Sequence, residues 1–143
     1  MRVFLFLPVF LFYVMQFPVQ SEEIERSESS ENASAHIIEP QNNQVLSSPV
    51  KVVFGLRNMG VAPAGVYYPN TGHHHLLINK KVKNMSVPLP SGEPNVLHFG
   101  GGQTEAFIDL SPGKYTLQLL MGDLNHVPHN PPVQSEVISI SVE

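Results

Sequence analysis

The sequence contains no cysteine and few basic residues, and no segment of it repeats apolar residues at helical spacing. The absence of cysteine excludes a disulfide framework, thiolate metal ligands and a lipoprotein attachment site. From His36 onward seven acidic residues stand against six Lys or Arg, so the clustered basic surface that a nucleic-acid-binding protein needs is missing. Together with 13 Pro and 10 Gly, the lack of helical periodicity argues against long helices.

Motifs of enzyme chemistry are also missing. There is no GxSxG, no HExxH and no catalytic cysteine. Gly100, Gly101 and Gly102 lack the lysine and the following helix of a phosphate-binding loop, and we interpret them as a place where the chain turns closely. We therefore assign no catalytic residue and expect no enzyme. Catalysis at a bound metal with an open coordination position is the one route that the sequence leaves.

Residues 1–21 have the pattern of a targeting segment, because one Arg precedes a run of apolar and aromatic residues. We interpret it as a secretory signal peptide, which predicts a periplasmic or secreted protein without a membrane span after cleavage. An uncleaved anchor is the alternative, although the run is short and Pro8 and Gln16 interrupt it. Residues 22–35 hold five Glu and one Arg, and this composition predicts a flexible acidic linker.

Residues 36–143 read as short strands separated by turn residues, because apolar residues alternate with polar ones in several segments. Seven strands at even spacing predict an all-β domain, an immunoglobulin-like β-sandwich, with a jelly roll or cupredoxin-like barrel as the alternative. Tyr115 follows the turn 111–113, where such sandwiches often place a tyrosine that ties a corner. The expected strands are 36–38, 50–57, 74–78, 82–89, 104–110, 115–121 and 138–142.

The expected topology predicts where the histidines lie in the fold. If each strand reverses the direction of the one before, the three longest loops lie at one end of the sandwich. All seven histidines then map to that end. They are His36 at the start of the first strand, His73, His74 and His75 at the start of the third, His98 in the connection 90–103, and His126 and His129 in the loop after strand 115–121.

A histidine cluster without cysteine predicts a transition-metal site, because neutral imidazole is the commonest side-chain metal ligand. Copper is favoured, then zinc or nickel, since Met121 and Met59 fall at the same end and thioethers suit Cu(I). Asp123 could orient a ligand imidazole. The expected ligands are two of the three consecutive histidines with His126, His129 or both; the full candidate set is His73, His74, His75, His98, His126, His129 and Met121.

Two other interpretations of the histidines stay open. They could be structural residues that hold the long loops in place, in a scaffolding module that binds a protein. They could also line a non-metal ligand site together with Tyr67 and Tyr68. Neither the partner protein nor the oligomeric state follows from the sequence.

Several long motifs resemble a known family. The segments VVFGLRNMGVAPAG, TGHHHLLIN, HFGGGQTEAFIDLSPGKYTLQLLMGDLNHVPHNPP and SEVISISV are similar to an exported bacterial family described only as domain of unknown function 4399. The resemblance spans roughly residues 37 to 142. It implies a small extracytoplasmic β domain of a Gram-negative bacterium, and it brings no established activity.

Overall fold

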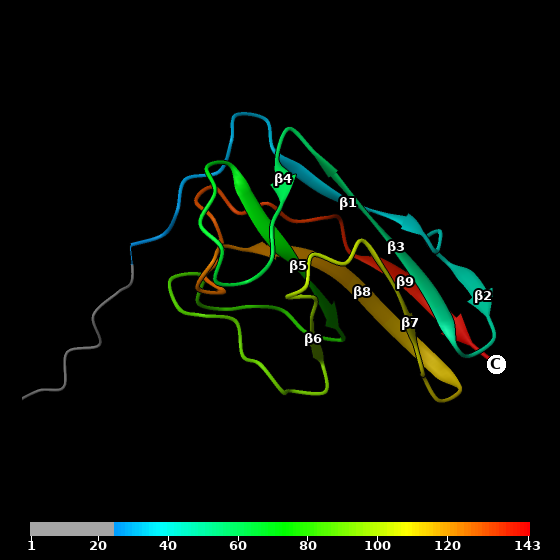
Figure 1. Cartoon of the computed structure of the whole chain (residues 1–143). Coiled ribbons are helices and arrows are strands. Elements are labelled where there is room, and N and C mark those ends of the chain that lie inside the picture. Colours follow the sequence, from blue (N-terminus) through cyan, green and yellow to red (C-terminus); the bar gives the residue numbers. More distant parts are fainter. Residues whose placement is uncertain (1–24) are drawn as a thin grey trace, which may run out of the picture.

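The computed structural model describes residues 25–143, so the predicted signal peptide lies outside the described residues. Within this range the chain forms nine strands in two sheets and no helix (Figure 1). Accordingly, none of the residues from 25 onward belongs to a helix long and apolar enough to cross a membrane. The strands are β1 (Ser34–Glu39), β2 (Gln44–Leu46), β3 (Val50–Arg57), β4 (Gly60–Val61), β5 (Thr71–Ile78), β6 (Val96–His98), β7 (Glu105–Ile108), β8 (Gly113–Gly122) and β9 (Ile138–Val142).

The two sheets face one another. The smaller has the order β1-β3-β7 with antiparallel pairs, and the larger has the order β2-β9-β8-β5-β4, with β6 also paired to β5. Pairs in the larger sheet are antiparallel except β2–β9 and β4–β5, which are parallel. The prediction of an all-β sandwich is confirmed, whereas its immunoglobulin-like type stays a prediction.

The core lies between the sheets because strand periodicity sends alternate side chains inward. On β3 the buried residues Val50, Val52 and Phe54 alternate with more exposed neighbours. They pack in one cluster with inward residues of β8 such as Leu117 and Leu119. This alternation is the pattern visible in the sequence, and it is why these strands were predicted at nearly their observed positions.

Tyr115 forms the expected corner tie. Its hydroxyl donates a hydrogen bond to the carbonyl oxygen of Ser111 at 2.8 Å, four residues upstream. The ring packs against the main core cluster. The turn from β7 into β8 is therefore fixed by the residue that the sequence singled out.

The predicted strand 82–89 is wrong. This segment has no regular secondary structure and instead covers the outer face of the larger sheet, where Leu89 packs with Leu77 and Leu120. Two physical causes explain the difference: prolines at 88 and 90 cannot donate to a strand ladder, and the free edge of β5 is occupied by β4 and β6. Conversely, β6 formed inside a predicted connection.

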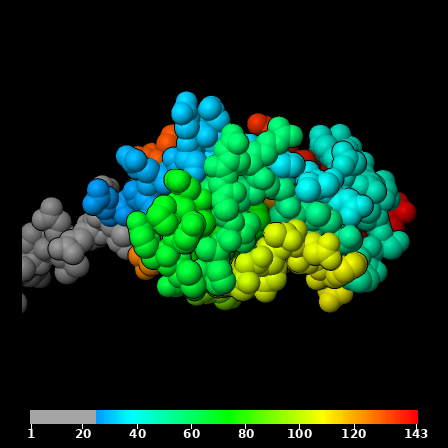
Figure 2. All heavy atoms as spheres, turned by 45° about the horizontal axis from the view of Figure 1, so that its top comes forward, coloured from blue at the N-terminus to red at the C-terminus, as the bar shows by residue number. Residues whose placement is uncertain are grey.

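Residues 26–29, within the predicted linker, lie against the loop that follows β8. Arg26 donates hydrogen bonds to the carbonyl oxygens of Pro128 and His129, at 2.9 Å for Pro128. The Ser29 amide bonds to the Asn130 carbonyl, and the Ser27 hydroxyl bonds to Asp123. In Figure 2 the blue residues after the grey trace lie against orange atoms of this loop. This part of the chain thus braces the end of the sandwich.

Candidate metal centre

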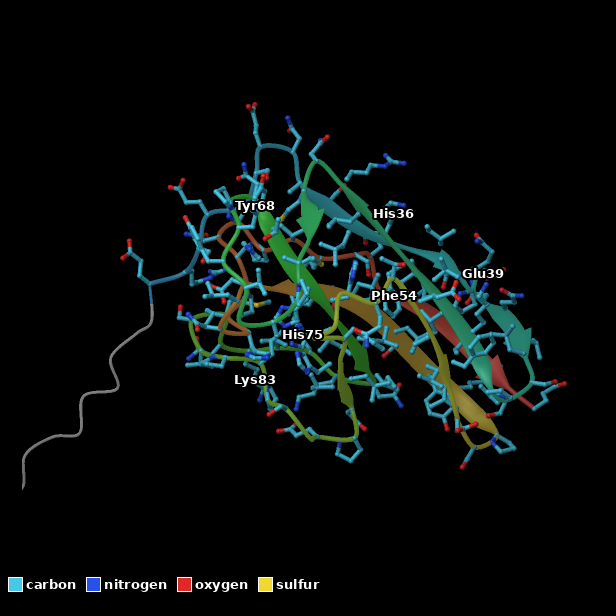
Figure 3. The ribbon with its side chains drawn as sticks, in the orientation of Figure 1. His36, Glu39, Phe54, Tyr68, His75 and Lys83 are labelled. Carbon is cyan, nitrogen blue, oxygen red and sulfur yellow. The ribbon has the colours of Figure 1, made fainter. Side chains whose placement is uncertain are left out.

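Strand β5 carries the three consecutive histidines, and both of its faces are buried from Gly72 to Ile78. Alternation places His73 and His75 on the outer face of the larger sheet, with Leu77, whereas His74 points inward with Leu76. The covering segment 79–95 explains how the outer face becomes buried. Figure 3 places His75 on the side of Lys83, which belongs to that segment, and Phe54 between the sheets.

His98 and His126 complete a cluster of four imidazole rings on this outer face. His98 ends β6 and lies opposite His75 in the β5–β6 register, and His126 comes from the loop after β8. All six separations between the ring centroids fall between 4.7 Å, for His98 and His126, and 5.9 Å, for His75 and His126. His73, His98 and His126 each offer a ring nitrogen within 4.8 Å of the others. We call these four residues the histidine cluster.

Asp123 shapes the loop that presents His126. One carboxylate oxygen accepts hydrogen bonds from the amides of Asn125 and Val127, at 2.8 and 3.0 Å, and the other accepts the Ser27 hydroxyl at 2.7 Å. The resulting tight turn holds His126 at φ 68°, a conformation uncommon for a residue with a side chain. Asp123 was expected to orient a ligand imidazole directly; its described hydrogen bonds instead go to the turn and to Ser27, so it positions His126 through the backbone.

Two glycines make room for the rings. A Cβ atom on Gly100 would lie 2.3 Å from Cε1 of His98, and one on Gly122 would lie 2.8 Å from Cε1 of His75. Neither approach is possible for a residue with a side chain unless the ring moves. This role was not predicted, although the glycine run 100–102, which begins two residues after His98, was a visible signal for Gly100.

Burial keeps His73 and His75 of the histidine cluster neutral. Burial, together with the neighbouring histidines, lowers the pKa of His73 to about 4 and that of His75 to about 3. Burial also lowers the pKa of His98, with a smaller contribution from His126. At neutral pH these rings therefore hold free lone pairs, which is the state that binds a metal ion.

His73 and His75 also lack hydrogen-bond partners. Neither ring nitrogen of His73 or of His75 is bonded to any group in residues 25–143. An unsatisfied buried polar group costs about 1–3 kcal/mol, and native proteins keep few of them. Four such nitrogens on adjacent residues of one strand face therefore call for a ligand.

The four residues of the histidine cluster differ in their exposure to solvent. His73 and His75 are about 1% exposed or less, His126 is half-buried, and His98 is exposed. A metal ion could therefore reach the buried rings from the side of β6 and the loop after β8.

The other candidate ligands lie elsewhere. His74 packs on the ring of Phe54 inside the sandwich, with centroids 5.1 Å apart. Met121 is fully buried in the same core cluster, on the inner face of β8. His129 directs Nε2 toward the Thr71 carbonyl oxygen, 3.2 Å away.

His36, expected at the same end as the other six histidines, does not join the histidine cluster. Its ring lies against Gly55 in the β1–β3 register of the smaller sheet, where a Cβ on Gly55 would be only 2.1 Å from Nε2. Figure 3 shows His36 on the opposite side of the molecule from His75. His36 therefore lies on the smaller sheet, whereas His75 lies on the larger sheet.

The donor set fits a transition metal. Four imidazoles around a tetrahedral ion with metal–nitrogen bonds near 2.0 Å would place their ring centroids about 5 Å apart, close to the separations seen in the histidine cluster. Two Nε2 atoms, of His98 and His126, already lie 3.1 Å apart. The arrangement can hold an ion by small ring movements.

Comparison with known proteins identifies a family for this chain. A search of curated proteins and a search of solved structures each found nothing similar to this chain. The model of one family matches residues 52–143, from the middle of β3 to the last residue, and so includes all four residues of the histidine cluster. The chain therefore belongs to the family described as Domain of unknown function (DUF4399).

Proposed function

We propose that this protein binds a divalent transition-metal ion, Cu(II) in preference to Zn(II), through His73, His75, His98 and His126. The observation that carries the proposal is the convergence of four imidazoles from three separate segments, two of them buried without hydrogen-bond partners. His129, outside the histidine cluster, shows the alternative arrangement, with its Nε2 3.2 Å from the Thr71 carbonyl oxygen.

The choice of metal follows from the ligand atoms. Imidazole nitrogens suit copper, zinc and nickel, and affinity of such sites for divalent ions peaks at Cu(II). The thioether of Met121 lies on the inner face of the larger sheet, so the argument for Cu(I) from methionine loses its support. Copper stays the first expectation, now as Cu(II).

The graded exposure favours exchange of the ion over permanent storage. A ligand at the surface, His98, can leave the ion first and open a position for an acceptor, while His73 and His75 still hold it. Together with the predicted signal peptide, this supports a role as an extracytoplasmic metal carrier or buffer.

The test is a titration of the purified protein, without a histidine tag, with Cu(II) and with Zn(II) by isothermal titration calorimetry. We expect one ion per chain with submicromolar affinity. Electron paramagnetic resonance of the Cu(II) form should show hyperfine coupling from at least three nitrogens.

The matched variants are His126→Ala, which removes a half-buried ligand, and His36→Ala, which removes one histidine from the opposite side of the molecule. His126→Ala should weaken binding at least tenfold, and His36→Ala should leave it unchanged. Equal binding by both variants, or no binding tighter than about micromolar, would instead favour a scaffolding module with structural histidines.

A further inference from the structure

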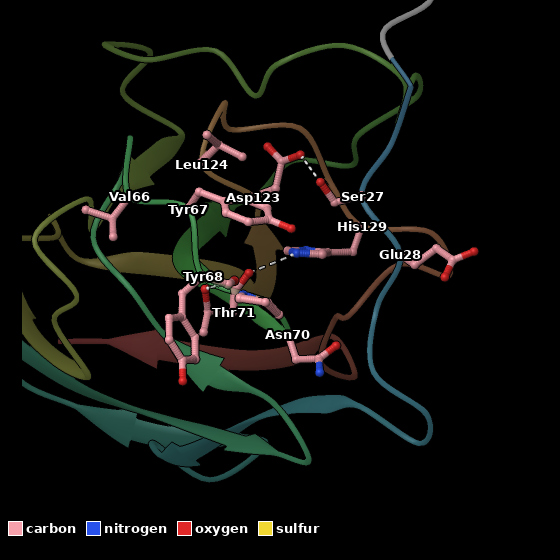
Figure 4. Close-up of a pocket in the computed structure, with 11 residues that line it drawn as sticks. Ser27, Glu28, Val66, Tyr67, Tyr68, Asn70, Thr71, Asp123, Leu124 and His129 are labelled. Carbon is pink, nitrogen blue, oxygen red and sulfur yellow. Dashed lines mark hydrogen bonds between the residues drawn. The ribbon is translucent and has the colours of Figure 1, made fainter.

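A second site lies beside the histidine cluster, in a cavity of about 350 Å³. Its walls come from residues 66–71, which lead into β5, from the loop after β8, and from residues 27–28 (Figure 4). Small-molecule sites begin at about 300 Å³, so the space suits a ligand of a few heavy atoms. Neither His98 nor His126 lines it, which makes it distinct from the proposed metal site.

Two tyrosines dominate one wall of the cavity. Tyr67 is 76% exposed and Tyr68 is 68% exposed, which makes them the most exposed large apolar side chains of residues 25–143. Their segment is nevertheless held in place. The Gly65 amide bonds to the Leu124 carbonyl at 3.0 Å, and the Thr71 hydroxyl bonds to the Tyr68 carbonyl at 2.8 Å. The rings are therefore presented to solvent by a fixed backbone.

The charged residues that line the cavity are acidic. The acidic residues of the lining are Asp123 and Glu28, and no Lys or Arg lines the cavity. Figure 4 shows the Glu28 side chain directed away from the two tyrosines. His129, also in the wall, is 1% exposed, and burial lowers its pKa, so its imidazole is neutral at pH 7. Arg26 does not line the cavity; its guanidinium, which keeps its positive charge, donates hydrogen bonds to the carbonyl oxygens of Pro128 and His129.

We propose that this cavity binds a small organic ammonium ion, such as a quaternary or methylated amine. Aromatic faces attract such cations through their negative quadrupole, and methylated ammonium groups are recognised by clusters of aromatic rings. The carboxylate of Asp123 in the wall supplies the compensating charge. A hydrated metal ion gains less from an aromatic wall, and an anion would be repelled by this carboxylate.

The test is nuclear magnetic resonance titration of the full chain, kept metal-free with a chelator, with choline. The neutral comparison ligand is 3,3-dimethylbutan-1-ol, which has the shape of choline without its charge. We expect saturable shifts for Thr71 and Leu124 with choline at about millimolar affinity, and at least fivefold weaker binding of the alcohol.

Three variants locate the site. Tyr67→Leu and Tyr68→Leu should each weaken choline binding about tenfold, because each removes one aromatic face. Phe107→Leu is the matched control, since it changes a 65% exposed aromatic residue on β7 and should have no effect.

Equal affinity for choline and the alcohol would overturn the proposal, because charge would then play no part. So would unchanged choline binding in both tyrosine variants, or the absence of saturable shifts. None of these outcomes bears on metal binding, since the titration is done without metal.

Discussion

The Nε2 atoms of His98 and His126 lie 3.1 Å apart, although the two residues are 28 positions apart in the chain. Two neutral imidazoles can share one proton at this distance, but a metal ion can take both lone pairs at once. The pair also forms the more exposed side of the histidine cluster. It is therefore the place where an incoming ion would first meet two ligands.

Metal binding should stabilise the fold. Because an ion bound to His73, His75, His98 and His126 joins three segments of the folded chain, an ion at one hundred times its dissociation constant should add about 2.7 kcal/mol to the free energy of unfolding. Thermal denaturation followed by circular dichroism, with Zn(II) and after addition of a chelator, measures this difference. The same melting temperature in both samples would contradict it.

Gly100 should be essential for the site but not for the fold. A methyl group in Gly100→Ala would collide with the ring of His98, which is exposed and can turn away, so we expect metal affinity to fall at least tenfold with little loss of stability. Gly101→Ala is the control, because its Cβ would meet only the flexible side chain of Gln103. Calorimetric titration compares the two. Similar losses of affinity in both variants would show that the position of the His98 ring is not the cause.

Asp123 should act through the turn that it holds. In Asp123→Ala the amides of Asn125 and Val127 lose their carboxylate acceptor, so we expect a loss of about 1–3 kcal/mol in the free energy of unfolding. Metal affinity should fall as well, because His126 is no longer fixed. Urea denaturation and metal titration check the two effects.

The control for this variant is Asp109→Ala, an exposed aspartate after β7, which should change neither quantity. If Asp123→Ala keeps both its stability and its affinity, the turn is held by other contacts.

Stability of the metal-free protein should fall with decreasing pH. Burial lowers the pKa of His73 and His74 to about 4 and that of His75 to about 3, from an ordinary value near 6.5. The unfolded chain therefore binds protons at pH values where the folded chain does not. The contribution of these histidines is complete above pH 6.5, is lost as the pH falls from 6.5 toward 4, and changes little below about 3.

Urea denaturation at several pH values between 7.5 and 4.5, with a chelator present, measures this slope. His75→Leu should show a shallower slope because it removes one of the three titrating groups. A stability that is constant down to pH 4.5 would be incompatible with neutral buried rings.

The sequence predicted the strands that alternate, such as β3 and β9, because half-buried strands record their two faces in their residues. The sequence could not show which side chains of β5 face outward and which face the core between the sheets. That strand is covered on both sides, so Leu76 and Leu77 are equally buried, and only the covering segment 79–95 distinguishes the face of His73 from the face of His74.

The choice between His126 and His129 was also beyond the sequence. Both lie in one loop, and their directions depend on the turn at Asp123 and on the positive φ of His126. Such a turn is made by a carboxylate and two amides in three dimensions, and no spacing rule records it. Clustering of residue type was therefore informative, and the exact ligand set was not.

The position of β9 has a consequence for how the protein folds. This strand lies between β8 and β2, and its partner residues in β2 are almost one hundred positions earlier, as in the pair Gln44 and Ile140. The larger sheet therefore cannot be completed while residues 138–142 are still being synthesised. Pairing over such sequence distances is slow because the chain entropy is lost before the contacts form. Until β9 has paired, one edge of β8 stays open. Folding therefore depends on this edge staying free of other pairing until β9 reaches it.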